Sequence, residues 1–151
     1  MSGITIRDAI VSDVPVLHRM MHELAEHDGL MDIFKATEDS LRRDGFGDPR
    51  RFRALIAEAD GDTAGYVRFD EGYSPFTGRG FLEVDDVYVR ERFRRRGIGK
   101  AMMLRLRGLA LAQSLNLRWE MEFENHRARA FYEELGATTR PKRICYWKVA
   151  G

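Results

Sequence analysis

The chain has 151 residues, of which 44% are hydrophobic and 32% charged, and its formal net charge is +1 at pH 7. These values are typical of a soluble globular protein, and we expect residues 1–151 to form a single domain with its own core. The apolar runs are shorter than the roughly 18–20 residues of a membrane span, and the one cysteine, Cys145, excludes a disulfide framework. We therefore expect a cytoplasmic protein with no membrane partner.

The first half of the chain predicts two helices followed by a β-hairpin. Asp13 opens a helix that tolerates Pro15 in its first turn, and Thr37 can cap a second helix. Asp60-Gly61 is a strong hairpin signal between two β-prone runs. In chain order we expect strand 3–8, helices from Asp13 to Gly29 and from Thr37 towards Gly45, strands 52–59 and 63–70, and a loop at 71–80.

The second half predicts strands that alternate with helices. The run "FLEVDDVYV" at 81–89 is a strand, and a helix follows Gly97. Asn125 caps a later helix that Gly136 closes. Further strands are expected at 117–123 and at 142–149, with Cys145 packed in the last one. The order β-α-α-β-β-β-α-β-α-β is that of a mixed α/β or α+β protein built on one sheet with packed helices.

Positive charge is concentrated in one stretch, residues 90–107. It holds a single acidic residue, Glu91, so that its local charge is +7 and the rest of the chain carries −6. Such a basic island in an acidic body indicates one anionic ligand, while a solvated basic face or a nucleic-acid patch remains the alternative. Its eight basic side chains are Arg90, Arg92, Arg94, Arg95, Arg96, Lys100, Arg105 and Arg107.

The turn Gly97-Ile98-Gly99 lies between a predicted strand and a predicted helix. Glycines permit a close backbone approach, and a helix N-terminus carries about half a positive charge, so this arrangement is suited to an anion. A nucleotide-binding Walker A loop is excluded because Ala101 follows Lys100. A dinucleotide fingerprint is excluded because residue 102 is methionine. Taken alone, the turn is also compatible with plain helix initiation.

The longer string Val89-x-x-x-Phe93-Arg94-x-x-Gly97-Ile98-Gly99 resembles the acetyl-CoA signature of the GNAT acetyltransferase superfamily. The segment "WEMEFENHRARAFYEELGA" (119–137) is similar to the later strand-Asn-helix segment of that superfamily. Residues 73–89, "YSPFTGRGFLEVDDVYV", resemble its spermidine/spermine (thialysine) acetyltransferase branch. The resemblance implies an α+β fold: a central, mostly antiparallel, twisted sheet flanked by helices and splayed between the fourth and fifth strands. It also implies a homodimer.

The resemblance further implies where acetyl-CoA, the co-substrate, would bind. Val87 and Val89 would offer backbone groups to its pantetheine arm, and Asn125 would either contact that arm or cap its helix. Arg95 stands where the family often has glycine, and Glu124 where the branch usually has an aromatic residue. The pyrophosphate would be cradled by Arg94, Arg95, Arg96, Gly97, Ile98, Gly99, Lys100 and Ala101.

Two side chains are candidates for acid–base chemistry. Tyr132 stands where the family carries its general acid, although an apolar helix stripe makes a core aromatic the alternative. Asp85 aligns with the acidic residue of the branch and would act as base through a water. Period-two alternation predicts Glu83 and Asp85 on one face of the strand and Asp86 on the other. Asp85 could instead pair with an arginine or hold the substrate, with Glu120 and Glu122 as further candidate bases.

These features predict an enzyme that transfers an acetyl group from acetyl-CoA to a primary amine by direct attack, without a metal. Because the carboxylates lie on the acceptor side, we expect a small cationic acceptor, either a polyamine or a molecule like a diamino acid. The alternative is a non-catalytic module of the same fold that binds acyl-CoA, or a nucleic-acid binder that uses the basic patch.

Overall fold

A computed structural model describes residues 3–151, which fall into two compact units, one up to Trp119 and one from Glu120 to Gly151. The first unit contains five strands and three helices, with short 3-10 turns at Val11–Asp13, Met31–Ile33 and Glu91–Phe93. In chain order its main elements are β1 (Ile4–Asp8), α1 (Val14–His27), α2 (Glu38–Phe46), β2 (Arg53–Ala59), β3 (Asp62–Ser74), β4 (Arg79–Val89), α3 (Ile98–Ala112) and β5 (Asn116–Trp119).

The strands form one sheet in the order β1-β2-β3-β4-β5. The first four strands pair antiparallel, whereas β5 runs parallel to β4. The β4–β5 pairing joins Phe81–Val84 to Asn116–Trp119 and stops there, while β4 continues to Val89. This is the mixed, mostly antiparallel sheet that the sequence predicts, and the expected fold class is confirmed.

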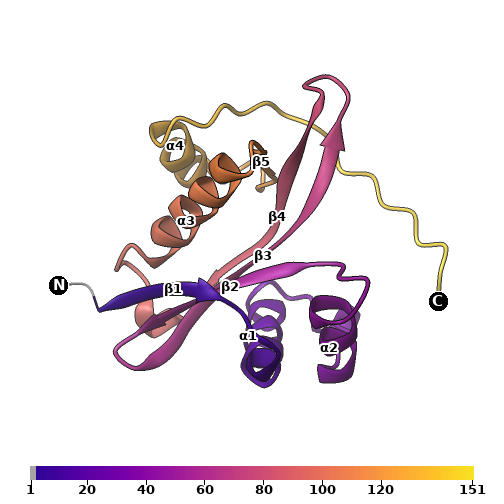
Figure 1. Ribbon diagram of the computed structural model, residues 1–151, viewed down its shortest axis with the longest axis vertical. Helices are drawn as coiled ribbons and strands as arrows, with labels where there is room; N and C mark the ends of the chain where they lie inside the picture. The colour runs from indigo at the N-terminus through magenta and orange to yellow at the C-terminus, as the bar shows by residue number, and fades with distance from the viewer. Residues whose placement is uncertain (1–2) are drawn as a thin grey trace. The chain divides into compact units, whose positions relative to one another are not determined.

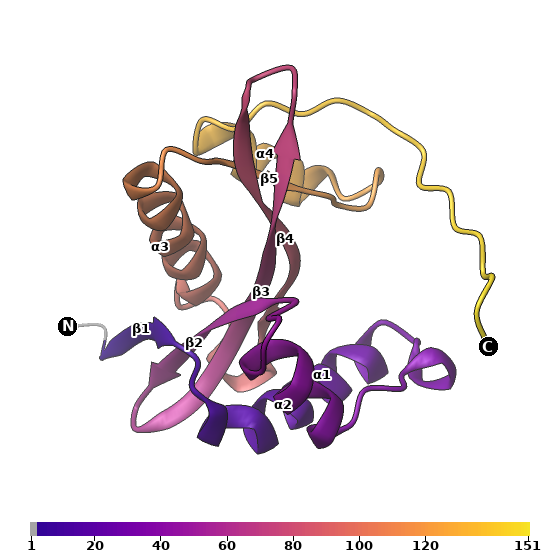
Figure 2. The same ribbon diagram turned by 45° about the vertical axis from the view of Figure 1, so that its right-hand side comes forward.

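Helices cover both faces of the sheet in the first unit (Figures 1 and 2). Period-two alternation in β2 explains this, because Ala54 and Ile56 face α1 and α2, while Leu55 between them faces the α3 side. On the first face the buried cluster includes Leu17, Met20, Leu41, Ile56 and Tyr66. On the other side α3 buries Ile98, Met102, Met103, Leu106 and Ala110. The sheet therefore separates two apolar layers.

Helix α2 packs closely against the strand that follows it. Thr37 caps the helix, since its hydroxyl oxygen accepts from the Ser40 N–H at 3.0 Å. Gly45 is buried near its C-terminus, and a Cβ built there would lie 2.5 Å from Cζ of Phe52. The missing side chain at Gly45 is therefore what lets the Phe52 ring lie against the helix.

Residues 71–80, predicted as a loop, are mostly strand. β3 continues to Ser74 and β4 begins at Arg79, so the two form a long hairpin that extends beyond β2 (Figure 2). The three glycines and the one proline of the stretch favour a loop, but antiparallel pairing such as Gly72 with Phe81 overrides that local preference.

The second unit contains one helix, α4 (His126–Glu134). The Asn125 side chain caps it, accepting from the Ala128 N–H at 3.1 Å, as predicted. The strand expected at 142–149 is absent from the described residues, and the predicted strand at 117–123 is limited to β5 at its start. A strand is stable only when its backbone groups are paired, and residues 142–149 are exposed and have no ladder partner. Cys145, expected to be packed, is exposed.

Within residues 3–151, every helix is too short or too polar to cross a membrane.

The contact between Gly45 and Phe52 gives a stability prediction. In an exposed helix, Gly→Ala stabilises by up to about 1 kcal/mol. Gly45→Ala should instead destabilise by roughly 1–3 kcal/mol, because its Cβ would overpack the Phe52 ring. Gly108→Ala on α3 is the matched control, since a Cβ there meets nothing within 4 Å and should stabilise. Urea denaturation compares them, and equal gains in both variants would contradict the packing argument.

Candidate active site

A β-bulge lies in the middle of β4. Arg68 pairs with Asp86 and the next residue of β3, Phe69, pairs with Val84, so Asp85 is the extra residue on β4. A bulge directs two successive side chains to the same side of the strand. The predicted alternation, with Asp85 and Asp86 on opposite faces, is therefore wrong, because both carboxylates meet the same arginine.

That arginine is Arg68 of β3. Its Nε donates to Oδ2 of Asp86 at 2.7 Å, and its Nη1 lies 3.4 Å from Oδ2 of Asp85. The Tyr66 hydroxyl donates to the same Asp86 oxygen at 3.5 Å. Tyr66 is fully buried, and burial raises the pKa of its hydroxyl, which keeps it a donor. The cluster therefore holds two carboxylates and one guanidinium.

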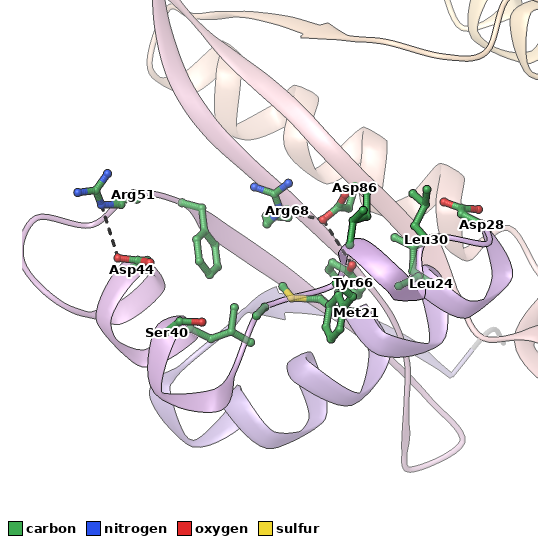
Figure 3. Close-up of a pocket in the computed structure, with 16 residues that line it drawn as sticks. Met21, Leu24, Asp28, Leu30, Ser40, Asp44, Arg51, Tyr66, Arg68 and Asp86 are labelled. Atoms are coloured by element: carbon green, nitrogen blue, oxygen red, sulfur yellow. Dashed lines mark hydrogen bonds and ion pairs between the residues drawn. The ribbon is translucent and has the colours of Figure 1, made fainter. Parts of the chain in front are cut away.

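Tyr66, Arg68 and Asp86 of this cluster form one wall of a cavity of about 510 Å³ between the sheet and the α1–α2 region (Figure 3). The cavity is also lined by Asp28, which follows α1 and is drawn beside Asp86, and by the ion pair of Asp44 with Arg51 at the other end of the view (Figure 3). The remaining wall is mainly apolar and includes Met21, Leu24, Ala25, Leu30, Ile33, Phe34, Ala36, Leu41 and Phe52. The cavity can therefore hold a small molecule with an aliphatic body and charged ends.

The Asp85 carboxyl is set up to exchange a proton near neutral pH. Desolvation raises its pKa to about 6, and the like charges of Asp70, Asp86 and Glu83 add to this effect. The attraction of Arg68 opposes the rise without cancelling it. A group with such a pKa can accept a proton at pH 7 and release it again, as a general base must.

The glycine turn has the backbone geometry of an anion site. Gly97 is in the left-handed region, at φ +77°, and Arg95 is there too, at φ +65°. Arg95 therefore adopts a conformation that glycine enters more easily. Within residues 3–151 the N–H groups of Arg95, Arg96 and Gly97 donate no hydrogen bond, and those of the first turn of α3 are unpaired by helix geometry. These donors together can bind a phosphate group.

Part of the basic island holds the fold together. Arg90 binds Glu23 of α1 through two hydrogen bonds of 3.1 and 3.0 Å. Arg92 pairs with Asp62, and Arg96 pairs with Asp60 at 2.7 Å; both acids lie at the turn between β2 and β3. These ion pairs neutralise three of the eight basic residues. The positive field at the turn therefore comes from Arg94, Arg95, Lys100, Arg105 and Arg107, which form no ion pair within the described part of the chain.

The end of β4 presents an open backbone edge beside the turn. Arg90 N–H donates to Ala64 O at 2.8 Å, which fixes the hydrogen-bonding phase of the β3–β4 ladder. In that phase Val87 and Val89 direct their N–H and C=O groups away from β3. β5 does not reach this part of β4, and the Arg94 side chain donates to Val89 O at 2.9 Å. The remaining groups of this edge can bind an extended ligand.

In the second unit, Tyr132 lies on α4 next to Phe131, with ring centroids 5.2 Å apart. Burial raises the pKa of the Tyr132 hydroxyl, which therefore stays protonated at neutral pH. Asn125, just before α4, has its side-chain oxygen engaged as the helix cap.

Comparison with known proteins identifies the family. The sequence model described as "Acetyltransferase (GNAT) family" matches residues 17–137, and pig (Sus scrofa) thialysine N-epsilon-acetyltransferase is 34% identical over 146 residues, covering 91% of this chain and 85% of that protein. The chain belongs to the GNAT acetyltransferase family. The L-ornithine N5-acetyltransferase of Arabidopsis thaliana is 24% identical over 188 residues, covering 93% of this chain and 82% of that protein. An aminoglycoside acetyltransferase structure from an uncultured soil sample shares the fold at 12% identity, with a TM-score of 0.80 over 99% of this chain and 97% of that one.

The first unit of this GNAT acetyltransferase brings several predicted site residues together. The segment from Arg94 to Ala101 comprises the turn up to Gly97 and the start of α3, and it follows the β4 end that carries Val87 and Val89. Tyr132 and Asn125 belong to the second unit. Sequence reasoning missed Arg68 and Tyr66, which bind the Asp86 carboxylate. A usable signal was present, because Arg68 interrupts an otherwise buried strand, "TAGYVRF", and a charge there needs a partner.

The raised pKa of Asp85 predicts a pH-dependent stability effect. Because its pKa of about 6 in the folded protein lies above the ordinary 3.8, the folded state loses stability as the pH rises from about 4 to 6. Asp85→Asn carries no charge, so it should be more stable than wild type above pH 6, by on the order of 1 kcal/mol after solvent screening. Below about pH 4 the two should be equal.

Urea denaturation between pH 4 and 8 measures this difference, with the exposed Asp32→Asn as control. A variant that is less stable than wild type at pH 7 would show that the attraction of Arg68 outweighs desolvation at Asp85.

Proposed function

We propose that the protein transfers the acetyl group of acetyl-CoA to a primary amine of a small acceptor by direct attack. The observation that carries this proposal is the bulge in β4. It places Asp85, with its raised pKa, on a strand whose far end is an open backbone edge beside a phosphate-type turn. Family membership and the acetyltransferase relatives support the reaction type.

The residues of the turn fit the anionic end of acetyl-CoA. Arg95 to Gly97 and the first turn of α3 supply N–H donors, and the space next to Gly99 is open, since a Cβ there meets only Val89 Cγ2 at 3.9 Å. Five unpaired basic side chains add long-range attraction. Val87 and Val89 would pair with the amides of the pantetheine arm as an added strand does.

We propose that the acceptor is a small molecule like a diamino acid or a polyamine, bound in the cavity beside Asp86. Of the carboxylates in the cavity wall, Asp44 is paired with Arg43 and Arg51 and Asp86 with Arg68. Asp28 has no arginine or lysine partner within the described residues, and its negative charge favours a cation. The apolar wall suits an aliphatic chain. The names of the relatives, thialysine and L-ornithine acetyltransferases, support the diamino acid.

Asp85 and Tyr132 would carry the proton transfers. An alkylammonium with a pKa near 10.4 is neutral only about once in 10^3.4 at pH 7, a cost of roughly 4.6 kcal/mol that a base reduces. Asp85 takes this proton through a water, and the neutral nitrogen then forms its bond to the thioester carbon. As the carbon–sulfur bond breaks, Tyr132 gives its proton to the departing sulfur, and the second proton that the nitrogen loses on becoming an amide restores the Tyr132 hydroxyl. The products are the acetylated amine and CoA.

We further propose that residues 1–151 act as one acetyltransferase domain, because the family match at 17–137 spans both units. The resemblance to the thialysine branch supports a cytoplasmic homodimer. Analytical ultracentrifugation of the purified chain tests the dimer.

The reaction is tested by incubating the protein with acetyl-CoA and one amine at a time. L-ornithine, thialysine, lysine and spermidine cover the proposed acceptors, and free CoA thiol and acetylated product are both quantified. We expect at least one of these amines to be acetylated. CoA binding without product from any amine would favour a non-catalytic acyl-CoA-binding module instead.

Gly99→Val tests the acetyl-CoA site. Its branched side chain would occupy the space that the phosphates need, so affinity for CoA should fall about 100-fold or more, the equivalent of two hydrogen bonds to a charged group. The fold should survive, because the site of the Cβ is open. Isothermal titration calorimetry measures affinity, with Gly108→Ala on the same helix as control. Wild-type affinity in Gly99→Val would remove this turn from the site.

Tyr132→Phe tests the general acid. The variant keeps the ring and its packing and loses only the proton, so kcat should fall about 10²–10⁴-fold while affinity for CoA is unchanged. Tyr146→Phe, at an exposed tyrosine of the same unit, is the control. A normal kcat with lowered stability would instead make Tyr132 a packing residue.

A further inference from the structure

The two carboxylates at the β4 bulge are not equivalent. Asp86 accepts from Arg68 Nε at 2.7 Å and also from the Tyr66 hydroxyl. Asp85 has only the longer contact, 3.4 Å from Arg68 Nη1. One guanidinium therefore contacts both acids, with its short, well-directed bond on Asp86.

The Arg68 guanidinium is fixed from a second direction. Its Cζ lies 5.9 Å from the centre of the Phe52 ring, and that ring is seated where Gly45 leaves room on α2. The side chains of Arg68 and Asp86 are 30% and 25% exposed, so their ion pair is partly desolvated. An arginine held by an aromatic ring and by two carboxylates has little freedom to turn away.

We propose that Arg68 is a positioning residue that gives the two carboxylates different tasks: it holds Asp86 in an ion pair and leaves Asp85 to exchange the proton. This inference rests on the proposed function, in which Asp85 is the base. Without Arg68, two adjacent carboxylates would share one proton and neither would be a defined base.

The charges around Asp85 make Arg68 the controlling group. Asp70 on β3 and Glu83 on β4 repel a negative charge at Asp85, as Asp86 does. Arg118 of β5 lies 3.4 Å from Glu83 and partly compensates that one residue. The cavity wall that holds Arg68 and Asp86 also contains the ionisable groups of Tyr66, Asp28, Asp44 and Arg51. Arg68 is thus the one cation in contact with Asp85 within residues 3–151.

Two substitutions should shift the pH dependence of acetyl transfer in opposite directions. Arg68→Met removes the cation, so the acid limb of the kcat/KM profile should move up by about 1 pH unit or more. Asp86→Asn removes a like charge and frees Arg68 for Asp85, so the limb should move down. A residue that only stabilises the fold would not produce opposite shifts.

The matched control is Arg53→Met, since Arg53 lies on the neighbouring strand over the Phe69 ring, 5.1 Å from its centre, and makes no ion pair in the described chain. Its profile should match wild type. The same shifts should appear in the carboxyl ¹³C resonance of Asp85, which NMR follows through a pH titration without any turnover. This second readout separates the inference from the proposed function.

Each outcome either supports or overturns the role of Arg68. Opposite shifts in both the rate profile and the Asp85 resonance establish the role of Arg68. An unmoved Asp85 resonance in both variants overturns it, even if acetyl transfer by the wild type is normal. A shifted resonance without acetyl transfer by the wild type would leave the pairing intact and overturn the proposed function. If Arg68→Met does not fold, Asp86→Asn decides alone, by whether the resonance moves down.

Discussion

The ion pair between Arg68 and the bulge of β4 is the interaction on which the candidate active site depends. One extra residue in β4 brings Asp85 and Asp86 to the same side of the strand. Ordinary pairing would have sent one carboxylate into the apolar layer beneath α3, where an unpaired charge is costly. The bulge avoids that cost and creates a cluster of two carboxylates and one guanidinium on the cavity side of the sheet.

This cluster links the packing of the first unit to its chemistry. Gly45 makes room for Phe52, Phe52 supports Arg68, and Arg68 contacts the two carboxylates. The chain of contacts runs from α2 through the start of β2 to the middle of the sheet. Asp85 thus stands on a strand that pairs with β3 both before and after the bulge, and not on a loop. Its desolvation raises its pKa at the expense of stability, as is common at functional sites.

The basic residues divide between structure and ligand attraction. Arg90, Arg92 and Arg96 use their charge on Glu23, Asp62 and Asp60, and so fasten the turn before α3 to α1 and to the β2–β3 hairpin. The N–H donors of the turn are then held in a fixed geometry, and the unpaired cations lie on the turn and along α3. A local charge counted from the sequence overstates the field at the site, because it includes arginines that the fold has already neutralised.

The sequence by itself determined the order of the elements in the first unit, the glycine turn and the family. Each depends on neighbours in the chain: the Thr37 cap, the Asp60-Gly61 hairpin, and the strand-turn-helix around Gly97. It also gave Asp85 as a candidate base. It could not give the long β3–β4 hairpin, because pairing with a partner strand overrides the local preferences of residues 71–80. The prediction of a strand at 142–149 was wrong for a related reason: its sequence favours a strand, but no neighbouring strand within residues 3–151 pairs with it.

Only the tertiary structure decided the bulge and its arginine. A register shift arises between two strands, and period-two alternation read along β4 alone cannot detect it. Arg68 is 17 residues before Asp85 in the chain, and their contact exists because β3 and β4 are paired. The cavity likewise requires α1, α2 and the sheet together. Local patterns fix which residues are available for chemistry, whereas strand pairing decides which charged side chains come into contact.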